Sequence, residues 1–140
     1  MPEKCRVVVC GFDPMLVKGY LKTGARALWL HISDELYEEY QVKPGDTVSG
    51  NLLAVYDGDG KKTASPNEPF EWKTAQESGL AVLLPSEVIA KYQLTEFHFI
   101  EVEIVKISGK AVYPDQEKVS TKWWPEDKMK LEYKLAYQAP

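Results

Sequence analysis

The 140-residue chain has a formal net charge of −4, with 44% hydrophobic and 27% charged residues, which is ordinary for one soluble globular domain. No apolar run approaches the roughly 18–20 residues that span a bilayer, and two cysteines are too few for a disulfide framework. The first residues lack the basic-then-apolar layout of a signal peptide, so we expect a single cytoplasmic domain over residues 1–140.

The N-terminal part of the chain predicts two strands separated by a loop. Residues 5–10 form a short β-branched run, Cys-Arg-Val-Val-Val-Cys, which is typical of a buried strand. Residues 11–25 contain three glycines and a proline, which favours a loop or short irregular strands. Residues 26–32 alternate, with apolar side chains at every second position from Leu28, and this pattern predicts a half-buried strand.

A helix of about two turns is predicted at residues 33–40. Ser33 is a good N-cap, and the acidic residues that follow it stand where the helix dipole favours them. A helix this short is not stable alone, so we expect it to dock on a sheet. Pro44-Gly45 predicts a turn, and residues 47–56 predict the next strand.

The second half of the chain repeats this order. Gly50 predicts a bulge within the strand at 47–56. Residues 57–78, which follow this strand, are polar and rich in glycine and proline, which indicates a long loop that is functional or mobile. The elements predicted after the loop are a strand at 79–84, a helix at 85–92, a turn at 93–96 and a strand at 97–107. Residues 129–137 alternate strictly and give the clearest single strand signal in the chain.

Sliding the chain by 52 positions superimposes two strand–helix–strand units, at about residues 26–56 and 78–108. A fixed offset that keeps both periodicities in register favours a true duplication over a chance match of short strands. The aligned pairs include Leu28 with Leu80, Leu30 with Val82, Ile32 with Leu84, Glu35 with Glu87, Tyr40 with Tyr92 and Gln41 with Gln93. We therefore predict a mainly β fold, a small barrel of two tandem repeats with an extra C-terminal strand region at 109–140.

The residues of the first unit carry a resemblance to a known family. They run Ile32-Ser33-Asp34-Glu35-Leu36 and then Tyr40-Gln41-Val42-Lys43-Pro44-Gly45-Asp46-Thr47-Val48. In this pattern the unit resembles the AbrB/MazE family of swapped-hairpin transcription factors. The second unit, Leu84-Pro85-Ser86-Glu87-Val88 and Tyr92-Gln93-Leu94, keeps the family's proline but lacks the Pro-Gly-Asp turn. Together the two units cover about 80 of the 140 residues.

The resemblance implies how the units assemble. In that family two chains each contribute one unit and interlock as a dimeric barrel. Two tandem copies in one chain would build the same barrel as an intrachain pseudo-dimer, which could be a monomer or a homodimer. Double-psi barrels, such as the N-terminal domains of AAA-type ATPases, are built from two similar units, so the sequence leaves the manner of closure open.

The resemblance also implies a DNA-binding transcriptional regulator whose partner is duplex DNA, because AbrB-like proteins use basic residues before and at the start of the short helix. This chain departs from the pattern: positions that are often arginine in the family are Tyr37 and Glu38 in the first unit and Ile89 and Ala90 in the second. The nucleic-acid-binding candidates are therefore Lys18, Lys22, Arg26, Lys61, Lys62 and Lys73.

A second hypothesis is a non-enzymatic protein- or peptide-interaction barrel that does not bind DNA. The adjacent Trp123 and Trp124 should face opposite ways on an extended chain, so one of them could be an exposed partner-binding anchor. Alternatively, both tryptophans cover barrel ends. The acidic net charge of −4 and the missing helix arginines fit this hypothesis better than DNA binding.

Neither catalysis nor a cofactor is predicted. The chain has no Gly-x-Ser-x-Gly motif and no phosphate-cradling glycine loop. Cys5 and Cys10 should point to opposite faces of one strand, and His31 and His98 are isolated, so we expect no metal site. The run from Asp57 resembles the start of a calcium loop, but lysines stand where further ligands are needed, which indicates a turn.

Overall fold

A computed structural model describes residues 3–11, 28–76, 78–95 and 98–129. The described chain is mainly β, which confirms the predicted class. Among these residues no helix has the length and apolar character needed to cross a membrane. The predicted strand at 129–137 lies outside the described residues, apart from Met129, which is buried.

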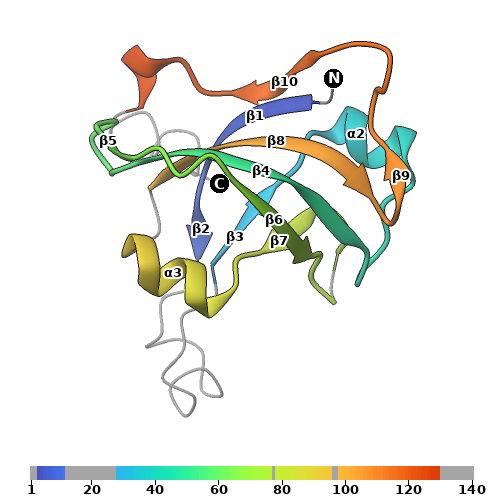
Figure 1. Ribbon diagram of the computed structural model, residues 1–140, viewed down its shortest axis with the longest axis horizontal. Coiled ribbons are helices and arrows are strands. Elements are labelled where there is room, and N and C mark those ends of the chain that lie inside the picture. The colour runs from blue at the N-terminus through green and yellow to red at the C-terminus, as the bar shows by residue number, and fades with distance from the viewer. Residues whose placement is uncertain (1–2, 12–27, 77, 96–97, 130–140) are drawn as a thin grey trace, which may run out of the picture.

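The elements predicted within the two units appear in the predicted order with small differences at their ends, whereas β5, β6, β9 and β10 were not predicted (Figure 1). Strand β4 has the predicted bounds. At Gly50 its pairing with β8 shifts register, but the extra residue there is Val105 of β8, and the bulge within β4 falls at Leu53. The elements of the first half are β1 (Glu3–Val8), β2 (Cys10–Gly11), β3 (Leu28–His31), α2 (Asp34–Glu39), β4 (Thr47–Tyr56) and β5 (Lys62–Ala64). Those of the second half are β6 (Glu68–Lys73), β7 (Ala81–Leu83), α3 (Ser86–Tyr92), β8 (Phe99–Ile107), β9 (Lys110–Ala111), β10 (Lys118–Trp123) and the 3₁₀ helix η1 (Glu126–Lys128).

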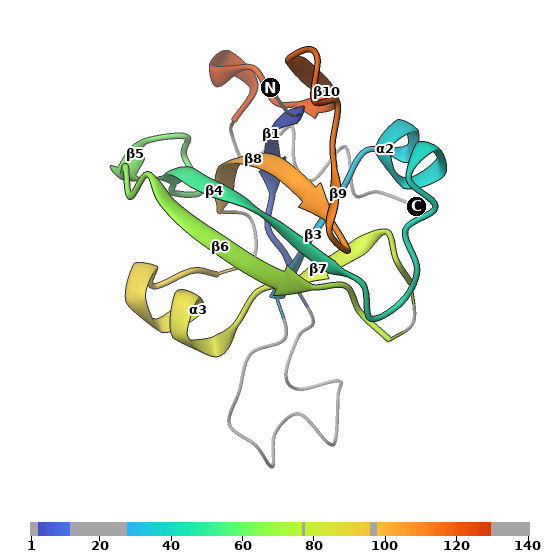
Figure 2. The same cartoon turned by 45° about the vertical axis from the view of Figure 1, so that its right-hand side comes forward.

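The strands form two sheets. The larger has the order β10-β1-β8-β4-β5, with β6 also paired to β4 and β9 to β8. Its pairs are antiparallel except for β1 with β10, which is parallel. The smaller sheet has the order β2-β3-β7 and is antiparallel. Figures 1 and 2 place the two short helices on opposite sides of the sheets, α2 beside β9 and α3 below β6.

Two short segments lead the chain from the larger sheet to the smaller one. Between β1 and β2 there is only Val9, whose N–H donates to the His98 carbonyl at 2.7 Å. After β6, Thr74 forms a bridge to Val82 of β7. The apolar side chains between the two sheets form the main core, which includes Leu36 from α2 and is buried almost completely.

The prediction of a long loop at residues 57–78 is wrong, because this segment contains β5 and β6. Strand β6 pairs with β4 over six residue pairs, from Thr47 with Lys73 to Leu52 with Glu68. Its apolar residues Phe70 and Trp72 are buried, and their rings stack with centroids 4.1 Å apart. The segment is thus part of the sheet and of the core.

Residues that stand 52 apart in the sequence face one another directly at two places. In the smaller sheet Leu30 is paired with Val82, and in the larger sheet Asn51 is paired with Glu103. Hydrogen bonds repeat at the same offset: the Ile32 N–H donates to the Leu80 carbonyl at 3.1 Å, and the Leu84 N–H donates to the Leu28 carbonyl at 2.9 Å. A glutamine with positive φ also follows each helix, Gln41 at 49° after α2 and Gln93 at 51° after α3.

The start of α2 is fixed by a buried carboxylate. The Ser33 hydroxyl oxygen accepts a hydrogen bond from the Leu36 N–H at 3.1 Å, as expected for an N-cap, and its O–H donates to the Glu3 carboxylate at 3.1 Å. Glu3 is only 1% exposed. Burial raises the pKa of the Glu3 carboxyl, and Glu35 raises it further, while the Ser33 hydrogen bond and Lys118 lower it.

We expect the burial of Glu3 to make stability depend on pH. Because its folded-state pKa is raised, the stabilisation from its protonation is complete below the unfolded pKa of about 4.3 and is lost as pH rises through the folded value. Glu3→Gln removes this titration. In urea unfolding, the free energy of unfolding of the wild type relative to that of the variant should therefore increase as pH falls from 7.5 to 5. Parallel pH profiles for the two proteins would contradict this.

Candidate functional site: a pocket beside Trp124

The basic residues proposed for DNA binding are not gathered in the described part of the chain. Lys61, Lys62 and Lys73 are all exposed. Lys62 is paired opposite Tyr56 and Lys73 opposite Thr47, which are the two ends of the ten-residue strand β4. At ~3.3 Å per residue these ends lie about 30 Å apart. Lys18, Lys22 and Arg26 lie outside the described residues, so the DNA hypothesis stays a prediction.

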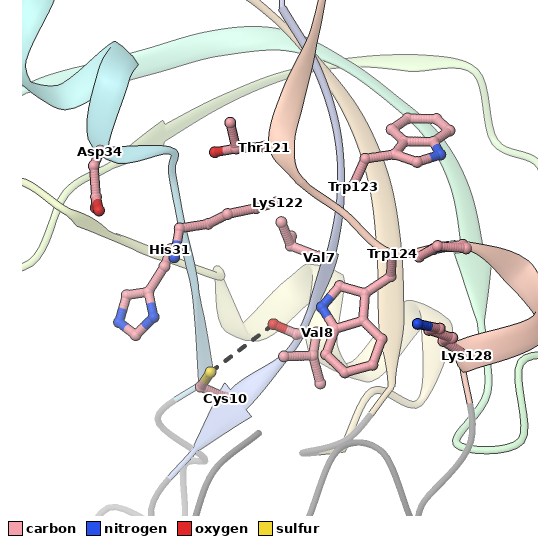
Figure 3. Close-up of a pocket in the computed structure, with 11 residues that line it drawn as sticks. Val7, Val8, Cys10, His31, Asp34, Thr121, Lys122, Trp123, Trp124 and Lys128 are labelled. Carbon is pink, nitrogen blue, oxygen red and sulfur yellow. Dashed lines mark hydrogen bonds between the residues drawn. The ribbon is translucent and has the colours of Figure 1, made fainter. Parts of the chain in front are cut away.

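The two tryptophans, in contrast, border a cavity of about 410 Å³, here called the Trp124 pocket. Its walls come from three segments far apart in sequence: β1 and β2, the stretch from β3 into α2, and β10 with the residues that follow it (Figure 3). The parallel pairing of β10 with β1 brings the third segment to the first. The lining residues used below are Val8, Cys10, His31, Asp34, Lys122 and Lys128, beside the tryptophans.

Arg6 of β1 holds the tryptophan segment in place. Its guanidinium donates to the Trp124 carbonyl at 3.1 Å, and its main-chain carbonyl accepts from the Trp124 N–H at 2.9 Å. The same guanidinium lies 4.4 Å from the centroid of the Trp123 ring and 5.3 Å from that of Tyr56. Its charge is balanced by Glu101 of β8, which accepts two hydrogen bonds at 2.9 and 3.2 Å.

The two indoles have different surroundings, as expected for neighbours on an extended chain. Trp123 stacks on Arg6, whereas Trp124 meets the buried ring of Phe99 edge-on, with centroids 5.2 Å apart. Figure 3 shows Trp124 directed toward Val8 and Trp123 directed away from it. Both side chains are half-buried, so neither is the exposed anchor that the sequence suggested. Trp124 instead forms an apolar wall of the pocket.

The opposite side of the pocket is polar. His31 is half-buried, and in Figure 3 the Lys122 side chain extends toward it from β10. Burial lowers the pKa of the His31 imidazole, Lys122 lowers it further, and Asp34 opposes both effects. Lys128 lies on the far side of Trp124 in the same view. Two lysines, a histidine and one carboxylate therefore line the pocket.

The two cysteines differ in access. Neither forms a disulfide. Cys5 is fully buried, and burial together with Glu3 raises the pKa of its thiol to about 12. Cys10 is half-buried, lines the Trp124 pocket and donates a weak hydrogen bond to the Val8 carbonyl at 3.9 Å. Cys10 is therefore a chemical probe of the pocket.

We expect iodoacetamide to add one carbamidomethyl group to the native protein, at Cys10, because its thiol is accessible and that of Cys5 is not. A second group should add only after denaturation. Mass spectrometry of the intact protein and of its peptides measures both. Cys10→Ala should remain unmodified when native. Equal labelling of both cysteines would contradict the described burial.

The chemistry that these groups allow is binding. An indole and a valine offer contact to an apolar group, and the lysines offer charge-assisted hydrogen bonds to an anion. Within the described residues no group of three or more His, Cys, Asp or Glu side chains is placed to hold a metal ion. The sequence pointed to the tryptophans but missed His31, Cys10 and Lys122, because no local pattern links residues that only the β1–β10 pairing brings together.

Comparison of the chain with protein-family models, with curated proteins and with solved structures finds no match.

Proposed function

We propose that this chain is a binding domain that captures a segment of a partner protein in the Trp124 pocket, rather than a DNA-binding regulator or an enzyme. The observation that carries the proposal is that the polar groups of the pocket occur in only one of two equivalent places in the fold. The equivalence of these two places follows from the pairing of the strands.

Two tandem units that close into a barrel account for the strand pairing. The order β1-β8-β4-β6 continues through the Thr74–Val82 bridge to β7, then to β3 and β2, and β2 follows β1 after one residue. Two sheets linked at both ends, by the isolated Thr74–Val82 bridge and by the chain from β1 to β2, support closure into a barrel. The direct pairing of residues 52 apart, at Leu30–Val82 and Asn51–Glu103, is what a two-fold axis between two copies would produce. These features support the duplicated barrel inferred from the AbrB-like pattern.

With the units aligned, the pocket can be compared with its equivalent in the second unit. Offset by 52, His31 corresponds to Leu83 and Asp34 to Ser86. The counterpart of Cys10 is found through its partner on the neighbouring strand. Cys10 is paired with Trp29, and the residue 52 positions after Trp29 is Ala81. The Ala81 carbonyl accepts a hydrogen bond from the Ala75 N–H, so Ala75 corresponds to Cys10. The equivalent place thus has small or apolar residues on the counterparts of β2, β3 and α2, and among the described residues no counterpart of β10 lies beside β6. The fold does not need a histidine, an acid and a thiol there, which supports a role in binding.

A selection from a random heptapeptide library displayed on phage tests the proposal. We expect immobilised wild-type protein to enrich a family of related peptides. Synthetic versions should slow the alkylation of Cys10 by iodoacetamide at least several-fold, because an occupant of the pocket covers this thiol. Peptides that bind without protecting Cys10 would place the site elsewhere and overturn the proposal. Deleting residues 57–78 is not a usable control, because it removes β6 and its two buried aromatic residues.

The DNA hypothesis predicts salt-sensitive binding to duplex DNA, whereas the peptide-binding proposal predicts none. Fluorescence anisotropy of labelled genomic duplex fragments across a salt series measures it directly. We expect no salt-sensitive binding, because the described candidates Lys62 and Lys73 lie at opposite ends of β4. Tight binding that falls steeply with salt, together with failure of the peptide selection, would restore the AbrB-like regulator.

A further inference from the structure

The charged residues that line the Trp124 pocket indicate the charge of the segment that it binds. Lys122, Lys128 and His31 converge on it from three elements, against the single carboxylate of Asp34. Among the described residues no ion pair engages Lys122 or Lys128, whereas Arg6 nearby is already neutralised by Glu101. The pocket is therefore a net cationic site in a chain whose formal net charge is −4. Such a site favours an anionic occupant.

The apolar wall and the size of the cavity add a second requirement. Trp124 and Val8 form one wall, so a purely anionic group would leave this surface uncovered. The cavity of about 410 Å³ is near the lower end of the range for ligand pockets, about 300–1,000 Å³. It is large enough for one or two side chains but too small for a helix. An extended segment that inserts two neighbouring side chains fits best.

Building on the proposed function, we infer that the Trp124 pocket binds an acidic peptide segment in which a carboxylate side chain stands next to a bulky apolar one, and that His31 takes up a proton as the segment binds. The carboxylate is held by Lys122 beside His31, the apolar side chain packs on Trp124, and Lys128 on the far side of the indole adds to the positive potential. Tryptophan is common among the residues that contribute most to binding energy.

The proton uptake follows from what faces His31. Lys122 of β10 disfavours the charged imidazole and Asp34 of α2 favours it, while the Cys10 thiol of β2 lines the same pocket. In the free protein, burial and Lys122 keep the pKa of His31 below its usual value. A bound carboxylate offsets the charge of Lys122 and raises this pKa. Affinity should therefore increase as pH falls from 7.5 toward 5.5, and level off once free His31 is itself protonated.

Calorimetric titration with synthetic peptides tests the requirement for a carboxylate. The probes are the peptides enriched by the library selection, acetylated and amidated so that only side chains carry charge. We expect replacement of the peptide's acidic residue by its amide to weaken Kd about tenfold, and replacement of its apolar neighbour by alanine to weaken it similarly. Lys122→Glu and Lys128→Glu should each weaken Kd at least about tenfold. Lys110→Glu is the matched control, because Lys110 is exposed on β9 and does not line the pocket; it should change Kd less than about twofold.

Titration in two buffers of different ionisation enthalpy counts the protons taken up on binding. We expect a fractional uptake near pH 6.5 in the wild type and its loss in His31→Gln, whose Kd should be independent of pH over this range. A wild type without proton uptake would overturn the role of His31.

The two levels of the proposal can fail separately. Peptides that protect Cys10 but contain no acidic residue, or whose amide versions bind equally well, would overturn the acidic occupant and leave the peptide-binding function in place. Failure to enrich any peptide that protects Cys10 would overturn both.

Discussion

Replacing Arg6 by methionine is expected to lower the free energy of unfolding by about 3 kcal/mol or more. Arg6 is 8% exposed and joins four elements: its guanidinium pairs with Glu101 of β8 at 2.9 Å, stacks on Tyr56 and Trp123, and bonds to the Trp124 carbonyl. Methionine fills similar space but leaves the Glu101 carboxylate largely buried without its cation. An uncompensated buried charge, rather than lost packing, is the main cost. Urea unfolding monitored by circular dichroism measures it.

A second substitution separates this cost from other effects. Adding Glu101→Gln to Arg6→Met removes the uncompensated charge, so the double variant should be more stable than Arg6→Met alone. Tryptophan fluorescence gives an independent readout, because Trp123 loses the cation stacked on its ring. An Arg6→Met variant within about 1 kcal/mol of the wild type would show that the ion pair contributes little net stability.

Gly50→Ala should be destabilising by at least about 3 kcal/mol, although it adds a single methyl group. A Cβ atom at Gly50 would lie 1.8 Å from the Glu103 carbonyl oxygen on the neighbouring strand β8. The neighbour is backbone rather than a flexible side chain, so β4 and β8 would have to separate at the bulge. Thermal and urea unfolding of the variant measure the loss.

Gly45→Ala is the matched control for this prediction. Gly45 has φ of +86°, and a Cβ there would meet nothing within 4 Å. Its replacement strains the backbone of a turn but causes no collision, so we expect a loss of only about 1 kcal/mol. Equal losses in the two variants would mean that conformational preference, and not the close approach of β4 to β8, explains Gly50.

Local signals in the sequence were sufficient for several elements and insufficient for others. The helix at α2 could be predicted because Ser33 caps it through a hydrogen bond to a residue three positions away. Strand β6 was missed because Pro69 and its charged neighbours resemble a loop. The alternation of Phe70 and Trp72 with exposed residues was the signal that could have revealed it. Polar residues dominate β6 because one of its faces is exposed.

The site was less predictable than the fold for a physical reason. Trp123 and Trp124 are unusual in composition, so the sequence alone singled them out. Their neighbours in the pocket depend on the parallel pairing of β10 with β1, in which Glu3 stands opposite Lys118 and Arg6 opposite Trp123. Parallel pairing of distant strands leaves no spacing pattern in the sequence. His31 therefore looked like an isolated structural histidine.

The position of β1 has a consequence for how the protein is made. The ribosome synthesises β1 first, yet its two neighbours in the sheet, β8 and β10, begin at Phe99 and Lys118. At about 5–20 residues per second, this strand waits roughly 5 to 20 seconds for a partner. Strand β6, by contrast, follows β4 in the sequence with only the short strand β5 between them. These two strands can therefore pair early. Assembly should thus start at β4 and β6 and finish with the insertion of β1 between β8 and β10, a long-range step that makes folding slow.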